Sequence, residues 1–166
     1  MSAIEFRSTR GAGAAISLSE AIRRGLAPDG GLYMPDRMPV PGATQVAGAA
    51  SLPTIVRHAL AGFFAGDRLE AALGEIADSA LAIEAPVSAV ACPEPLFALE
   101  LFHGPTAAFK DFGARFLAES LQRLEAHESR VLTILVATSG DTGGAVAGPF
   151  IGVPGRGWSS SIRRDR

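Results

Sequence analysis

One short segment constrains the fold more than any other: residues 131–136, VLTILV, form an apolar, β-branched run interrupted only by Thr133. A run this apolar has no side suited to water, which is typical of a strand buried on both faces of a parallel sheet. A loop of small polar residues, TSGDTGG at 138–144, follows directly, and a segment of small, helix-compatible residues comes next. Strand, loop and helix in this order predict an α/β fold with functional loops at the carboxyl ends of its strands.

The rest of the chain alternates extended and helical patterns. A short strand is predicted at 4–6, and a helix is expected to begin at Ser17, in a capping box with Glu20, and to end at a left-handed Gly25. The turn PDGG at 28–31 leads into an extended segment at 32–34. Apolar periodicity predicts helices over 51–64, 69–81 and 109–124, and strands over 87–91 and 96–102.

Composition excludes several classes of function. The 166 residues carry a formal net charge of −2, so no basic field favours nucleic acid or an anionic membrane surface. No stretch reaches the roughly 18–20 apolar residues of a membrane span, and the amino terminus has no apolar signal-peptide core. The single cysteine, Cys92, is interpreted as a buried, inert thiol in a reducing compartment. We therefore expect a soluble, cytoplasmic protein with no nucleic-acid or membrane partner.

Lys110 is the first candidate for chemistry. It follows the loop HGPT and stands beside Phe109 and near Phe112. Apolar surroundings favour the neutral, nucleophilic form of a lysine amine, which a Schiff-base lysine needs. A surface lysine in the first turn of a helix fits the same pattern. The nearby carboxylates Asp111 and Glu119 are interpreted as solvated helix-face residues.

The loop at 138–144 is the second candidate. Its N–H groups and hydroxyls can converge on an anion at a helix N-terminus, where glycine permits a close approach. It is not a nucleotide P-loop, because no Gly-Lys-Ser/Thr follows. Asp141 could hydrogen-bond a cofactor ring substituent or simply cap the loop. The three histidines lack metal-ligand spacing, so no metal site is predicted.

Three segments, taken together, resemble the threonine synthase family. They are STRG at 8–11 with GLAPDGGLYMP at 25–35, LELFHGPTAAFKDF at 99–112, and ATSGDTG at 137–143. Any one of them could occur in a related enzyme that uses pyridoxal 5'-phosphate (PLP), but all three in this order are specific. The resemblance covers about residues 4–155.

This resemblance implies a fold-type II PLP-dependent enzyme, with the tryptophan synthase beta-like fold in truncated form. The implied reaction converts O-phospho-L-homoserine, a small-molecule substrate, and water to L-threonine and phosphate. Lys110 would hold PLP as a Schiff base and shuttle protons between substrate carbons. The implied cofactor contacts, besides Lys110, are Asp141, Ser139, Gly140 and Thr142. The implied substrate contacts are Ser139, Thr142 and Thr106.

The final residues depart from the family. The tail 156–166, RGWSSSIRRDR, is polar and basic with no strand or helix period, where the family continues with an apolar strand. Codons shifted by one position can encode such a strand, so we hypothesise a frameshift near Arg156. The predicted regions are a threonine synthase N-terminal region at 1–90, the start of a PLP-binding α/β domain at 91–155, and an aberrant, frameshift-like tail at 156–166.

Two alternatives stay open. A non-catalytic truncated remnant would keep these motifs without turnover. Another fold-type II lyase, such as a serine/threonine dehydratase or a cysteine synthase, would share the lysine segment, although PDGG and HGPT argue against it. A glycine-rich loop for the PLP phosphate is not found after residue 144. Unpaired sheet edges and exposed apolar surface lead us to expect a chain that folds poorly or aggregates.

Overall fold

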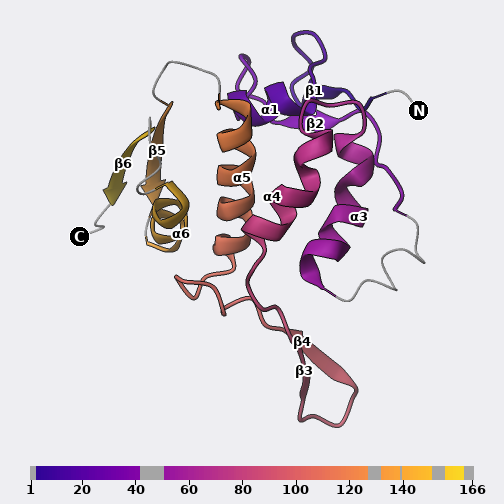
Figure 1. Ribbon diagram of the computed structural model, residues 1–166, viewed down its shortest axis with the longest axis vertical. Coiled ribbons are helices and arrows are strands. Elements are labelled where there is room, and N and C mark those ends of the chain that lie inside the picture. The colour runs from indigo at the N-terminus through magenta and orange to yellow at the C-terminus, as the bar shows by residue number, and fades with distance from the viewer. Residues whose placement is uncertain (1–2, 42–50, 127–131, 139, 151–155, 163–166) are drawn as a thin grey trace. The chain divides into compact units, whose positions relative to one another are not determined.

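The computed structural model describes residues 3–41, 51–126, 132–138, 140–150 and 156–162 (Figure 1). The chain divides into two units, one of residues 1–79 with 119–127 and one of residues 80–118 with 128–166. We call them the N-terminal unit and, after Lys110, the lysine unit. Helices and strands occur in both units, so the predicted α/β class is confirmed.

The N-terminal unit begins with an antiparallel strand pair. Strand β1 (Phe6–Ser8) pairs with β2 (Tyr33–Pro35), and β1 starts two residues later than predicted. Helix α1 (Leu18–Arg24) comes between them in the chain, and Ser17 Oγ caps it by accepting from the Glu20 N–H at 3.2 Å. This is the serine half of the predicted capping box, and the Glu20 carboxylate accepts from Arg24 Nε at 2.7 Å. At its end Gly25 has φ 70°, and the Leu26 N–H donates to the Arg24 carbonyl at 2.8 Å. The helix therefore leaves through a γ-turn.

Three further helical elements follow β2 in this unit. Helix α3 (Leu52–Phe64) has Ser51 as its N-cap. The helix predicted at 69–81 is a 3₁₀ turn, η1 (Glu70–Ala72), continuing into α4 (Leu73–Ala80). The buried apolar side chains of the unit are Ile4, Phe6, Ala27, Phe64, Leu69, Leu73, Ile76, Ala77, Leu121 and Leu124.

A hydrogen-bonded cluster around Asp29 explains the opening motifs. The Asp29 carboxylate accepts from the Ser8 hydroxyl at 2.7 Å, the Gly31 N–H at 2.9 Å and the Ala12 N–H at 3.2 Å. The Ser8 hydroxyl, followed by these N–H groups, lowers the pKa of Asp29. A β-carbon on Gly31 would lie 2.2 Å from Ser8 Oγ, so only glycine fits there. Residues of the STRG and PDGG motifs therefore form one hydrogen-bonded group, which we call the Asp29 cluster.

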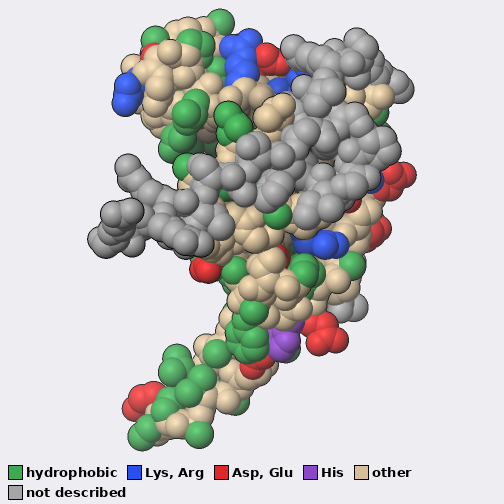
Figure 2. All heavy atoms as spheres, turned by 90° about the vertical axis from the view of Figure 1, so that its left-hand side faces the viewer, with side chains coloured by type: hydrophobic (Ala, Val, Ile, Leu, Met, Phe, Trp, Pro, Cys, Tyr) green, Lys and Arg blue, Asp and Glu red, His purple; other side chains and the backbone are tan. Residues whose placement is uncertain are grey.

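In the lysine unit, β3 (Val87–Val90) and β4 (Leu96–Leu99) pair with each other as an antiparallel hairpin. Val87 lies opposite Leu99 and Ala89 opposite Phe97, so these four side chains share one face. Phe97 and Val87 are each 64% exposed, and hydrophobic side chains cover the hairpin at the foot of Figure 2. The two predicted strands thus form an isolated hairpin whose apolar face has no cover within the described chain.

Cys92 lies in the turn of this hairpin. The prediction of a buried thiol was wrong: Cys92 is exposed, and its thiol donates to the Glu94 carbonyl at 2.8 Å. The apolar neighbours that indicated burial belong to the hairpin strands, and they are exposed themselves. Apolar sequence context alone therefore misplaced this side chain.

The remaining elements follow the predicted order. Helix α5 (Lys110–Leu124) is followed by β5 (Leu132–Thr138), α6 (Asp141–Phe150) and β6 (Arg156–Ile162). Strands β5 and β6 are parallel, with Leu132 opposite Arg156. The sequence of the tail has no strand period, yet 156–162 form β6, because a ladder of backbone hydrogen bonds does not require apolar side chains. The frameshift hypothesis stays a prediction.

Among the described residues, no helix combines the length and the apolar character needed to cross a membrane.

Candidate functional site

The loop that precedes Lys110 is held by hydrogen bonds to Asp111, the residue that follows the lysine. The Thr106 N–H donates to Asp111 Oδ2 at 2.9 Å, and the Thr106 hydroxyl donates to Oδ1 at 2.8 Å. Asp111 is only 1% exposed. The interpretation of Asp111 as a solvated carboxylate was therefore wrong, because the loop folds back over the first turn of α5. We call this arrangement the Asp111 clip.

Two backbone features complete the loop. The Ala107 N–H donates to the Gly104 carbonyl at 3.0 Å, which closes a tight turn. Ala107 has φ 55°, a conformation that costs energy for a residue with a side chain. A β-carbon on Gly104 would lie 2.3 Å from Asp111 Oδ2. The segment HGPTAA is therefore shaped to the buried carboxylate.

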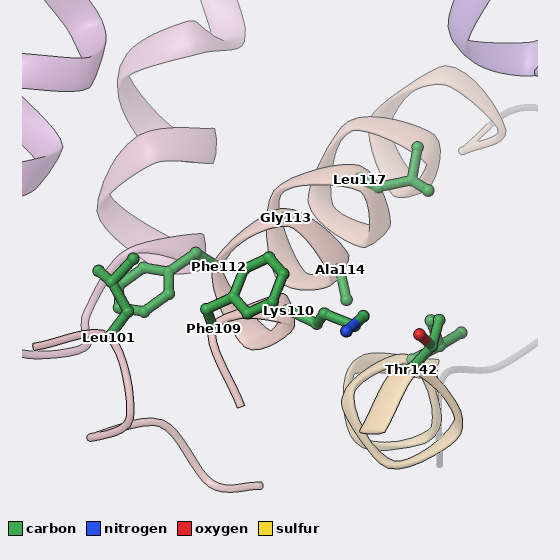
Figure 3. A pocket seen from close by; sticks show the side chains of 9 residues that line it. Leu101, Phe109, Lys110, Phe112, Gly113, Ala114, Leu117 and Thr142 are labelled. Atoms are coloured by element: carbon green, nitrogen blue, oxygen red, sulfur yellow. The ribbon is translucent and has the colours of Figure 1, made fainter. Parts of the chain in front are cut away.

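A pocket of about 590 Å³ lies beside Lys110. Lys110 extends from the start of α5 toward Thr142 on α6 (Figure 3). Its Nζ lies 4.6 Å from the centre of the Phe109 ring, a distance at which the ring face attracts a cation. The other lining residues are Leu101, Phe112, Gly113, Ala114, Leu117 and Val146. The pocket thus combines one amine, one hydroxyl and a largely apolar wall.

The second predicted loop is shorter than the sequence indicated. Helix α6 already begins at Asp141, so Thr142 and Gly143 lie in its first turn. The Gly140 N–H donates to Thr138 Oγ1 at 3.1 Å, and a β-carbon on Gly143 would lie 2.6 Å from Thr138 Cγ2. The glycines let the strand end and the helix start pack closely, which brings the N-terminal turn of α6 to the pocket.

The structure brings together some of the predicted site residues. Lys110 and Thr142 line the same pocket. Thr106 is not among its lining residues, and its hydroxyl proton is donated to Asp111, although its methyl group lies beside Gly144 of α6. Asp141 and Gly140 are exposed at the start of α6, and Ser139 lies outside the described residues.

The sequence contains a signal for the site that pattern reasoning missed. Lys110 is the only lysine among the fifteen lysine and arginine residues of the chain. Every other basic position is arginine, whose guanidinium does not lose its proton in proteins and cannot act as a nucleophile. The pocket is therefore lined by the one lysine amine that the chain has.

A second polar group lies next to this segment. His103 Nε2 is 2.7 Å from Glu100 Oε2, and the Ser88 hydroxyl donates to the other oxygen of Glu100. The Ser88 hydroxyl, with His103 second, lowers the pKa of Glu100.

Within the described ranges, no group of three or more His, Cys, Asp or Glu side chains is arranged to hold a metal ion.

These residues fit a compact organic cofactor that carries an aldehyde and an anionic group. The pocket volume is in the range of small-molecule sites, and its wall is mostly apolar with few polar groups. The amine can attach an aldehyde covalently. The N-terminal turn of α6 offers backbone N–H groups and the positive end of a helix dipole to an anion.

Comparison with known proteins gives a consistent result. The family described as threonine synthase N terminus matches residues 5–81. The chain is 40% identical to the threonine synthase of Haemophilus influenzae over 140 residues, which covers 83% of this chain and 32% of that protein. It is 40% identical over 141 residues to the threonine synthase of Escherichia coli, covering 84% of this chain and 32% of the relative.

Solved structures agree. The PLP-bound threonine synthase from Brucella melitensis matches with a TM-score of 0.82 and 33% identity, covering 95% of this chain and 35% of that one. The E. coli threonine synthase matches with a TM-score of 0.81 and 34% identity, covering 94% of this chain and 36% of that one. The chain therefore spans about a third of the length of the relatives it matches.

Proposed function

Because this chain belongs to the threonine synthase family and corresponds to its N-terminal third, we propose that it carries the lysine-bearing part of a PLP site. The reaction proposed for that site converts O-phospho-L-homoserine and water to L-threonine and phosphate. The observation that carries this proposal is the sole lysine of the chain, Lys110, extending into a pocket that it shares with Thr142.

Lys110 has two proposed roles. Its amine would attach the cofactor covalently, and once released by the substrate it would accept and return protons at the substrate carbons. Both roles need an amine that can exist without its proton, which arginine cannot provide. When bound, PLP would supply an electron sink for the carbanions of the reaction.

Residues 139–142 are proposed to bind anionic and ring groups. Thr142 offers a hydroxyl to the pocket, and Gly140 leaves the start of α6 open to a close approach. Ser139 is proposed to contact cofactor and substrate, and Asp141 the cofactor. Thr106 stays a proposed substrate contact, but its hydroxyl could only accept a hydrogen bond while it donates to Asp111.

The apolar wall is proposed to keep water from the reacting carbons. Phe109 covers the amine at 4.6 Å, and Leu101 and Phe112 line the same pocket. Water exclusion strengthens electrostatic interactions inside a site and suppresses side reactions.

The location of the protein and the division of its chain also stay proposals. We propose a cytoplasmic location. The proposed regions are a threonine synthase N-terminal region at 1–90, the start of a PLP-binding α/β domain at 91–155 and a frameshift-like tail at 156–166.

A phosphate-release assay tests the proposed reaction. The purified chain is supplied with PLP and O-phospho-L-homoserine, and Lys110→Arg and Glu119→Gln are assayed beside it. Glu119 is a fair control because it pairs with Arg123 on the same helix and does not line the pocket. Phosphate release by this site should be equal in the wild type and in Glu119→Gln and absent from Lys110→Arg.

Other outcomes would favour the alternatives. Covalent attachment of PLP without phosphate release would indicate a non-catalytic remnant. Lysine-dependent formation of a keto acid from serine or threonine, without turnover of O-phospho-L-homoserine, would indicate a dehydratase.

A further inference from the structure

Asp111 is a buried carboxylate that the proposed chemistry does not use. At 1% exposure it is among the most buried polar side chains described, although it adjoins a lysine on a loop that is otherwise largely exposed. Burying a carboxylate costs free energy unless hydrogen bonds replace the lost water. Both of its oxygens receive such bonds from Thr106. The first turn of α5 adds a favourable helix dipole for a negative charge.

The direction of the two neighbouring side chains is informative. Consecutive residues of a helix point about 100° apart, and Asp111 is not among the residues that line the pocket. Asp111 instead turns under the loop, while Lys110 lines the pocket. The carboxylate therefore acts on the position of the amine through the backbone that they share.

The surrounding loop is adapted to this contact. Gly104 leaves no space for a β-carbon beside Asp111 Oδ2, and Ala107 adopts a left-handed conformation in the same turn. Strained backbone persists only where surrounding contacts hold it, and it is common at functional sites. Thr106 also lies beside Gly144 of α6, so the clip connects the lysine loop with the helix that carries Thr142.

We propose that Asp111 is a positioning residue: with Thr106 it forms a clip that holds the Lys110 amine against Phe109 and toward Thr142. The reason for holding the amine in place rests on the proposed function, but the test of the clip does not require that PLP binds. In this arrangement Thr106 uses its hydroxyl proton to hold Asp111, so it does not donate a hydrogen bond to the substrate.

The test uses the fact that the chain has one lysine. The 166-residue chain is treated with trinitrobenzenesulfonate, and mass spectrometry follows the modification of Lys110. Three variants are compared: Thr106→Val removes the hydroxyl but keeps the shape, Thr106→Ser restores the hydroxyl, and Gly148→Ala adds a β-carbon in open space on α6. Thermal melting of each variant shows whether its fold is intact.

We expect Thr106→Val to raise the modification rate about tenfold, because a lost hydrogen bond to a charged group allows the loop to open more often. Thr106→Ser and Gly148→Ala should react at the wild-type rate. With PLP added, Thr106→Val should also show weaker visible circular dichroism per unit of visible absorbance, because a loosely held cofactor has no fixed orientation. A purely structural role would change the melting temperature and leave both of these readouts unchanged in folded protein.

The two proposals fail in different ways. Equal modification rates in Thr106→Val and the wild type, with both proteins folded, would overturn the clip even if PLP attaches. A faster rate in Thr106→Val, reversed in Thr106→Ser, would support the clip even if PLP never attaches to Lys110, in which case the proposed function alone fails.

Discussion

The two units of the chain differ in how many of their large apolar side chains they bury, although each also exposes some, such as Leu32 in one and Phe97 in the other. The N-terminal unit buries Phe6, Phe64 and Ile76 together with several leucines. Among the described residues of the lysine unit, the buried apolar ones are Leu81 and alanines, while its other large apolar side chains are half-buried, as at Phe112, or exposed, as at Phe97. Phe97, Leu99 and Phe109 are all more than half exposed. One unit therefore holds most of the described buried side chains, and the other holds the pocket beside Lys110.

This difference shows that a well-formed site does not require a well-formed core around it. The Asp111 clip orders the lysine loop with two hydrogen bonds and a tight turn, which are short-range contacts. The hairpin beside it has large apolar side chains that the described chain leaves in water. Hydrogen bonding within a loop can thus be complete where apolar packing is not.

The largest expected difference is in the free energy of unfolding, between alanine variants of one leucine in each unit. Leu69 is 2% exposed and Leu96 is 53% exposed. Leu69→Ala should lower the free energy of unfolding by about 3 kcal/mol, because it removes buried methyl groups and leaves a cavity. Leu96→Ala should change it by less than about 0.5 kcal/mol. Urea denaturation measures both, and equal losses in the two variants would remove the contrast between the units.

A matched pair of glycines tests whether the lysine loop is tightly fitted. Gly104→Ala forces a β-carbon to within 2.3 Å of Asp111 Oδ2, whereas Gly148→Ala meets nothing within 4 Å. Gly104→Ala should destabilise the loop by about 2 kcal/mol, as overpacking typically does. Limited proteolysis of the loop measures this opening. Equal cleavage rates in the two variants would mean that the loop adapts without cost.

Acid should weaken the N-terminal unit through Asp29. The pKa of Asp29 lies below its usual value of 3.8 because the Ser8 hydroxyl and the N–H groups of Gly31 and Ala12 favour the charged form. The stabilisation is therefore fully present above that usual value and is lost as the pH falls through the lowered pKa. Melting temperatures measured from about pH 6 to about pH 2 should fall less steeply in Asp29→Asn than in the wild type. Parallel profiles would show that the Asp29 cluster contributes no pH dependence.

The smallest effect on stability should come from the hairpin. Phe97→Glu should change the free energy of unfolding by less than about 0.5 kcal/mol, because the side chain is exposed. It should nevertheless reduce self-association, since exposed apolar patches promote it. Sedimentation velocity at several concentrations measures the change. A wild-type chain that stays monodisperse would contradict the expectation of aggregation.

The sequence predicted the elements better than their partners. The helices at 51–64 and 109–124 and the strand at 131–136 are found almost where the periodicity places them. Periodicity reports which side chains share a face, but it does not report what that face meets. The hairpin pairing of β3 with β4 and the exposed Cys92 were missed for this reason.

Lys110 and Thr142, which the motifs singled out, line one pocket, and their roles in cofactor and substrate binding stay predictions. The burial of Asp111 was not predictable, because it depends on a left-handed Ala107 and a tight turn at Gly104 that local propensity does not indicate. The fact that Lys110 is the only lysine was available in the sequence and is the simplest signal for the site.

The most direct measurement of the central claim is covalent trapping. The chain is incubated with PLP and reduced with borohydride, and the modified peptide is mapped by mass spectrometry in the wild type and in Lys110→Arg. We predict a visible absorbance band that reduction removes, with the cofactor mapped to Lys110 in the wild type and absent from Lys110→Arg. A band of equal intensity in Lys110→Arg, or a cofactor mapped only to the amino terminus, would contradict the assignment of Lys110 as the cofactor lysine.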